Sequence, residues 1–161
     1  LAVMLLVIYS VAAVRPALAD YYANKKETAL YRDHLLFTAI RLDPTNAEYY
    51  YQLGKQQGKL KAYSLQLAAY SKAVALNPTN SQYHQSLAWA YGQTDKVSQA
   101  HQEFKAAIEL NPNYYYPYQV YAIWLFNYPT NENIEKGAQI YRKATFLNPK
   151  LATRHWWSIS K

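Results

Sequence analysis

Histidine is the residue type in this 161-residue sequence best suited to acid–base or metal chemistry, and its four copies are isolated from one another. They are His34, His84, His101 and His155. None belongs to an HExxH or His-x-His arrangement, so no metal-ligand spacing is present. The absence of cysteine excludes thiolate nucleophiles, disulfides and cysteine-based zinc sites. We therefore expect structural or surface roles for the histidines, and no bound metal.

Other catalytic motifs are also missing from the sequence. The four glycines form neither GxGxxG nor GxxxxGK[ST], the loops that hold phosphates, and no serine lies in a GxSxG turn. The ten acidic residues are few and scattered, which gives no paired-carboxylate site. The sequence therefore predicts a protein that is not an enzyme and needs no cofactor.

The charge balance is basic, with 17 Lys and Arg against ten Asp and Glu, a formal charge of +7. This balance favours acidic partners in general. No run of five or more basic residues resembles a nucleic-acid-binding arm. We expect no nucleic-acid partner.

The elements that would position functional side chains are marked by recurring prolines. Four Asx-Pro steps, each preceded by a leucine, occur at intervals of 34, 34 and 37 residues: Asp43-Pro44, Asn77-Pro78, Asn111-Pro112 and Asn148-Pro149. Proline disfavours the α conformation in the residue before it, so each step is expected to end a helix. The period predicts repeated pairs of helices.

Residues at fixed offsets inside each period support this interpretation. Small residues, which permit close helix approach, are Gly54, Ala73, Ala88, Ala100, Ala107, Ala122, Gly137 and Ala144. Large rings, expected to fill the space between hairpins, are Tyr70, Phe104 and Tyr141. Thr45-x-x-Glu48 and Thr79-x-x-Gln82 predict capping boxes at the starts of helices.

Over residues 28–149 this pattern resembles the tetratricopeptide repeat family, whose period is 34 residues. The resemblance implies an all-α fold: a right-handed superhelical solenoid of helix-turn-helix repeats, here preceded by an apolar N-terminal helix. The consensus Trp position holds Tyr50, His84 and Tyr118, and Gln57 occupies a position that usually holds a ring.

The expected organisation follows from the proline positions. Residues 1–19 form an apolar helix, residues 20–44 a half repeat of one long helix, and residues 150–161 a C-terminal capping helix that carries Trp156 and Trp157. The three full repeats are 45–78, 79–112 and 113–149. The last contains three extra residues, which we expect to lengthen the turn near 127–133.

The family's concave groove implies a protein or peptide partner, bound by the first helix of each hairpin. The matching positions are Tyr51, Gln52, Lys55, Gln85, Trp89, Gln93, Tyr116, Gln119 and Ile123. Rings would supply contact area and amides would bond a peptide backbone, with Trp89 as the anchor. The alternative is that these side chains only contact neighbouring hairpins.

The first fourteen residues are uncharged and almost wholly apolar, but a bilayer span needs about 20 such residues. Three interpretations remain open: the end of a transmembrane helix, a signal peptide with a small-x-small site at Ala17-Leu18-Ala19, or a helix buried in an assembly. We favour a membrane helix, with repeats on the extracytoplasmic side. Because the sequence begins with leucine, residue 1 could be a native start, a processed end or a fragment boundary.

Three functions fit these observations. The first is a membrane-anchored, non-catalytic adaptor. The second is a structural subunit of a filament or large complex, with the N-terminal helix buried in the assembly and the tyrosines at 49–51 and 114–116 forming contacts. The third is the C-terminal part of a polytopic membrane enzyme, since residues 14–22 leading into repeats are similar to the corresponding junction of bacterial O-antigen ligase-like proteins.

Overall fold

The computed structural model describes residues 2–25 and 29–153, and side chains within 13–25 and 32–152. These residues form eight α-helices and one short 3₁₀ helix, with no β-strand in the described part, which confirms the all-α prediction. The chain divides into two compact units, residues 1–78 (unit 1) and residues 79–161 (unit 2), and each is described by itself.

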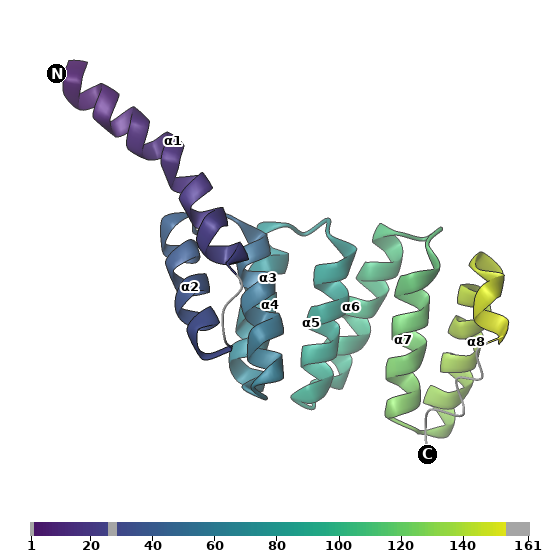
Figure 1. The fold of residues 1–161 in the computed structure, drawn as a ribbon. Coiled ribbons are helices and arrows are strands. Elements are labelled where there is room, and N and C mark those ends of the chain that lie inside the picture. Colours follow the sequence, from purple (N-terminus) through teal and green to yellow (C-terminus); the bar gives the residue numbers. More distant parts are fainter. Residues whose placement is uncertain (1, 26–28, 154–161) are drawn as a thin grey trace. The chain divides into compact units, whose positions relative to one another are not determined.

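Unit 1 contains four helices: α1 (Ala2–Asn24), α2 (Ala29–Leu42), α3 (Ala47–Lys59) and α4 (Tyr63–Leu76). Helices α3 and α4 form a hairpin, and α3 also packs against α2 (Figure 1). Small side chains allow this packing, because a Cβ added at Gly54 would lie 2.5 Å from the buried ring of Tyr70. The expected close approach at Gly54 is therefore present.

The single long helix predicted for residues 20–44 is wrong. Helix α1 continues to Asn24, and α2 is a separate helix that packs against it. This arrangement buries Ala19 and Ala23 in one cluster with Leu36 of α2, apolar surface that one continuous helix would leave in water. The Tyr49 hydroxyl of α3 donates a 2.6 Å hydrogen bond to Asp20, which ties α1 to the first hairpin.

No helix in the part of the chain that the structure describes is both long enough and apolar enough to cross a bilayer. The span predicted for residues 1–14 falls largely on residue 1 and on side chains 2–12, which lie outside the description. Membrane attachment therefore stays a prediction.

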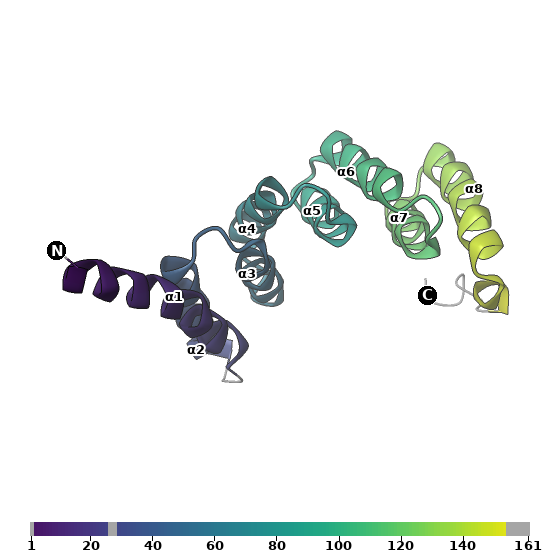
Figure 2. The ribbon, with the colours of Figure 1, turned by 90° about the horizontal axis from the view of Figure 1, so that it is seen from above.

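Unit 2 contains α5 (Ser81–Gln93), α6 (Val97–Leu110), α7 (Tyr115–Asn127), α8 (Asn131–Leu147) and the 3₁₀ helix η1 (Pro149–Thr153). Two hairpins, α5/α6 and α7/α8, lie side by side, with α7 against both α5 and α6 (Figure 2). Phe104 lies between them, fully buried and stacked on Tyr121 at a 4.9 Å centroid distance. Its expected role between hairpins is confirmed.

The three extra residues of the third repeat lengthen a helix, and the expected longer turn is not formed. Residues 128–130 join α7 to α8, as many residues as join the helices of the other two hairpins, while α8 has 17 residues against 14 in α4 and in α6. Thr130 caps the extended start by accepting from the Asn133 amide, and the Asn133 side chain donates to the Tyr128 carbonyl at 2.7 Å. These bonds satisfy groups that an early helix start exposes.

The predicted capping boxes are also corrected. The caps are Asn46 and Asn80, each one residue after the expected threonine, and each accepts from the backbone amide two residues later at 3.0 Å. The hydroxyl of Thr45 instead donates to Asp43 at 2.7 Å within the preceding turn. Asparagine is among the best capping residues because its side-chain oxygen reaches these free amides.

Two rings in the consensus Trp position fasten one repeat to the next. The Tyr50 hydroxyl donates to the Pro44 carbonyl at 3.2 Å, and the Tyr118 hydroxyl donates to the Pro112 carbonyl at 2.9 Å. A proline that ends one repeat thus accepts a bond from the first helix of the following repeat. This explains why tyrosine serves where tryptophan was expected.

After α8 the chain folds back over the last hairpin. Leu151 is buried in a cluster with Ala122 and Ala144, and its carbonyl accepts from the Tyr141 hydroxyl at 3.3 Å. Only η1 of the predicted capping helix is described. Trp156 and Trp157 lie outside the described residues.

Candidate protein-binding site

Five of the nine predicted groove residues form an accessible face on two neighbouring helices of unit 2. Helix α5 contributes Trp89 and Gln93, one turn apart, and α7 contributes Tyr116, Gln119 and Ile123 at spacings of three and four. Such spacings place side chains on one side of a helix. Tyr116 and Ile123 are 44% and 39% exposed, and the other three are partly exposed. We call these five residues the α5/α7 face.

Trp89 is the best-supported side chain of this face. It packs against the cluster that contains Phe104 and Trp124, while part of it stays accessible. A ring held by packing in this way loses little freedom when a partner covers the remainder. This placement is compatible with the predicted anchor role, which stays a prediction.

Gln85 has a structural environment. Its side chain is 7% exposed, and its amide donates to the Ser81 hydroxyl at 3.2 Å. Ser81 in turn donates to the Ala107 carbonyl at 2.9 Å, so this chain of bonds links α5 to α6. Gln85 is therefore engaged inside its own hairpin.

The three remaining predicted residues lie on α3 of unit 1. Tyr51 is 8% exposed and packs on Tyr70 at a centroid distance of 5.7 Å. The Lys55 ammonium lies 5.4 Å from the centre of the Tyr51 ring, within the range of a cation–π contact. Gln52 donates to Glu48 at 3.3 Å along its own helix. Only Lys55 among them is exposed.

Trp124 is a residue of this region that the sequence interpretation missed. It lies one position after Ile123, is 1% exposed, and its Nε1 has no hydrogen-bond partner among the described residues. A Cβ at Gly92 of α5 would meet this Nε1, so the absence of a side chain at Gly92 makes room for the ring. The buried Trp124 ring belongs to the cluster against which Trp89 of the α5/α7 face packs. Its signal in the sequence was the Ile-Trp-Leu-Phe run, which reads as ordinary core.

Among the described residues, one pair of side chains with acid–base groups is His101 and Tyr121, whose Nδ1 and hydroxyl oxygen are 2.6 Å apart. Burial raises the pKa of Tyr121 to about 12 and lowers the pKa of His101, and nearby Lys136 and Lys105 lower the latter further. The tyrosine therefore keeps its proton near neutral pH, and its hydroxyl donates a hydrogen bond to a neutral imidazole. The pair forms a structural link between α6 and α7.

A second polar link joins α5 to α6, where His84 Nδ1 and Glu103 Oε2 are 2.6 Å apart. No group of three His, Asp or Glu side chains in the described ranges could hold a metal ion. The pairs at His84 and at His101 connect helices within one unit.

This architecture defines a class: helical hairpins repeat along the chain, small residues lie where helices approach, and a proline follows each second helix. Residues 69–102 match the family model of the tetratricopeptide repeat, which confirms the predicted repeat type for that stretch. No curated protein sequence matches the chain significantly.

Solved structures of similar fold include a MamA crystal structure, at 20% identity and a TM-score of 0.69, with 89% of this chain and 81% of that chain covered. MamA from Desulfovibrio magneticus RS-1 gives 18% identity and a TM-score of 0.66, with 87% and 75% covered. YrrB, described as a TPR protein with an unusual peptide-binding site, gives 21% and 0.64, with 75% and 61% covered. At these identities the likeness shows a common fold.

Proposed function

We propose that this protein is a non-catalytic interaction scaffold that binds an extended or helical segment of a partner protein on the α5/α7 face. The observation that carries the proposal is the regular placement of rings, amides and one aliphatic side chain on the accessible side of two packed helices. The rest of the unit is held by buried rings and small residues.

The composition of the face suits a peptide. Trp89, Tyr116 and Ile123 offer apolar area, which supplies most of the favourable free energy of association. Gln119 can donate to and accept from a peptide backbone, whereas Gln93, whose side-chain oxygen is buried, can offer only its amide N–H groups. Aromatic side chains are enriched at protein interfaces, and the described peptide-binding site of YrrB supports the same use of this fold.

Peptide selection provides the test. A phage-displayed library of 12-residue peptides is panned on the full chain, and the affinity of selected peptides is measured by fluorescence anisotropy. We expect Trp89→Ala and Ile123→Glu each to weaken binding at least tenfold, since they remove an anchor ring or place a charge on the face. The matched control is Glu109→Ala, an exposed position on α6.

Two outcomes would contradict the proposal: no enriched peptides, or enriched peptides whose affinity is unchanged by both face variants. Trp89→Ala also removes packing against the buried cluster that contains Phe104, so circular dichroism must show an unchanged helix content before its result is counted. Ile123→Glu replaces a side chain that is already 39% exposed, and its fold is expected to be unaffected.

Membrane attachment through residues 1–14 is a separate part of the proposal. Its support is the apolar, uncharged character of this stretch and the Arg15 that follows it. We place the repeats on the extracytoplasmic side. Extraction of cell membranes with alkaline carbonate tests attachment, and protease accessibility in intact cells tests the side. Release of the full-length protein by carbonate would refute attachment while leaving peptide binding unaffected.

A further inference from the structure

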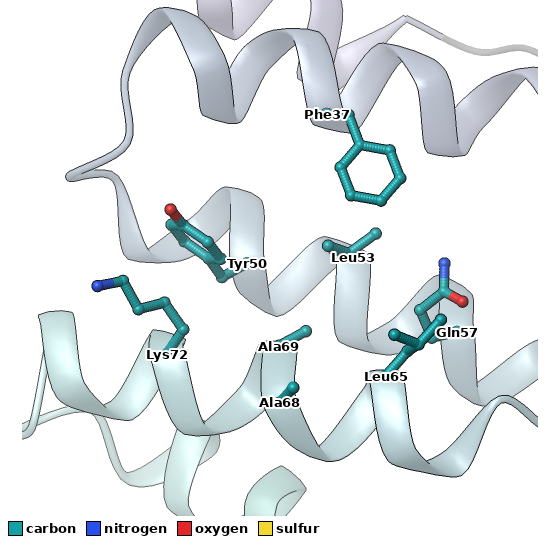
Figure 3. Close-up of a pocket in the computed structure, with 8 residues that line it drawn as sticks. All are labelled: Phe37, Tyr50, Leu53, Gln57, Leu65, Ala68, Ala69 and Lys72. Carbon is teal, nitrogen blue, oxygen red and sulfur yellow. The ribbon is translucent and has the colours of Figure 1, made fainter.

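Unit 1 contains an apolar pocket that the proposed function does not use. It has a volume of about 220 Å³ and is lined by side chains of α2, α3 and α4 (Figure 3). Its lining residues are Phe37, Tyr50, Leu53, Gln57, Leu65, Ala68, Ala69 and Lys72. No predicted groove residue belongs to this set.

The walls of this pocket leave large apolar side chains in water. Phe37 of α2 is 56% exposed and Leu65 of α4 is 61% exposed, and no polar atom contributes to the accessible wall. Single exposed apolar residues are ordinary, but two that flank one apolar hollow form a continuous patch suited to a partner. The described side chains of α1 pack elsewhere. They form a buried cluster with Leu36 and Ala39 of α2 and with residues of α3, and Phe37 does not belong to this cluster.

The two ends of the pocket differ in charge. At one end Lys72, an exposed residue, lies next to Tyr50 (Figure 3) and has no carboxylate partner among the described residues. At the other end lies Gln57, whose side-chain amide is already bonded to Asp33 at 3.0 Å. A ligand can therefore gain a charged contact only at the Lys72 end, and that contact requires a negative group.

From this geometry we propose that the pocket receives one large apolar side chain of a partner protein, with an acidic residue beside it in contact with Lys72. The pocket volume favours a single side chain over a whole small molecule, because sites that enclose a small molecule are typically about 300–1,000 Å³. The basic excess of unit 1, nine Lys and Arg against five Asp and Glu, attracts such an acidic segment. The site is separate from the α5/α7 face and does not depend on it.

Methyl NMR of the full chain tests the proposal with three probes: N-acetyl-Phe-Glu-amide, N-acetyl-Phe-Lys-amide and sodium decanoate. We expect the acidic dipeptide to shift the methyl signals of Leu53, Leu65, Ala68 and Ala69 saturably. Its affinity should exceed that of the Lys dipeptide by about two- to fivefold, the effect of one exposed ion pair. Lys72→Glu should reverse this preference while leaving the apolar side chains that line the pocket unchanged.

Ala68→Trp supplies the second variant, since a ring at this exposed wall position should fill the hollow and abolish the shifts. Peptides selected for the α5/α7 face should bind this variant normally, so failure of one site is distinguishable from failure of the other.

Four results would overturn the proposal: no saturable shifts, an equal response to both dipeptides, tighter binding of decanoate, or self-association of the chain that Ala68→Trp abolishes. The last two would identify a lipid or a second copy as the occupant.

Discussion

Replacing Gly54 by alanine has two opposing effects on the stability of unit 1, a gain in helix propensity and a steric clash. Alanine stabilises a helix interior by about 1 kcal/mol relative to glycine. The new Cβ, however, would lie 2.5 Å from two carbons of the Tyr70 ring, far inside van der Waals contact. That ring is 5% exposed and packed on Tyr51, so it cannot move aside without disturbing its neighbours. Overpacking typically costs 1–3 kcal/mol.

We therefore expect a net destabilisation of unit 1 of up to about 2 kcal/mol, the overpacking cost less the helix gain. Hydrogen exchange read by mass spectrometry measures this destabilisation locally: amide protection in α3 and α4 should fall by up to about 30-fold, while α7 and α8 serve as an internal reference.

A double variant isolates the cause. In a Tyr70→Leu background the clashing ring is absent, so Gly54→Ala should become neutral or stabilising by up to about 1 kcal/mol. The reasoning fails if Gly54→Ala increases protection in the natural background, or if its effect is the same in both backgrounds.

Four further outcomes are expected. Phe104→Ala should destabilise unit 2 by about 3–5 kcal/mol in urea denaturation, because it removes a fully buried ring; a loss below 1 kcal/mol would contradict its central position. Asn80→Ala should cost about 0.5–2 kcal/mol in the same assay and Asn80→Asp much less, since aspartate keeps the capping oxygen. Lys61→Gly should raise stability by about 1 kcal/mol, because Lys61 has φ of 57°, and a melting temperature that falls would count against this. Burial lowers the pKa of His101 from its usual 6.5, so near that pH the folded chain binds fewer protons than the unfolded chain. The stability that His101 contributes is therefore present above pH 6.5 and declines at lower pH. His101→Gln should flatten the pH dependence of the urea midpoint between about pH 7 and 5.

The candidate site was only partly readable from the sequence. Helical periodicity gives the side of a helix on which a residue lies, and this placed Trp89 and Ile123 on accessible surface. It does not give the neighbours, so the burial of Gln85 beneath a bond to Ser81 was not foreseen. The pocket beside Phe37 was missed for the same reason, because its walls come from three helices.

Local chemistry in the sequence was sufficient for the repeat itself. The proline period ends each second helix through a steric restriction on the preceding residue, and small residues such as Gly54 mark where two helices approach. These effects act within a few residues or within one hairpin, and a sequence records them directly.

Tertiary structure decided what depends on competition between alternatives of similar local energy. The cap moved from Thr79 to Asn80, the three extra residues joined α8, and the chain before Pro44 divided into α1 and α2. In each case several local conformations were acceptable. The choice went to the one that buried apolar surface and satisfied backbone groups across helices, and only the packed chain makes those contacts.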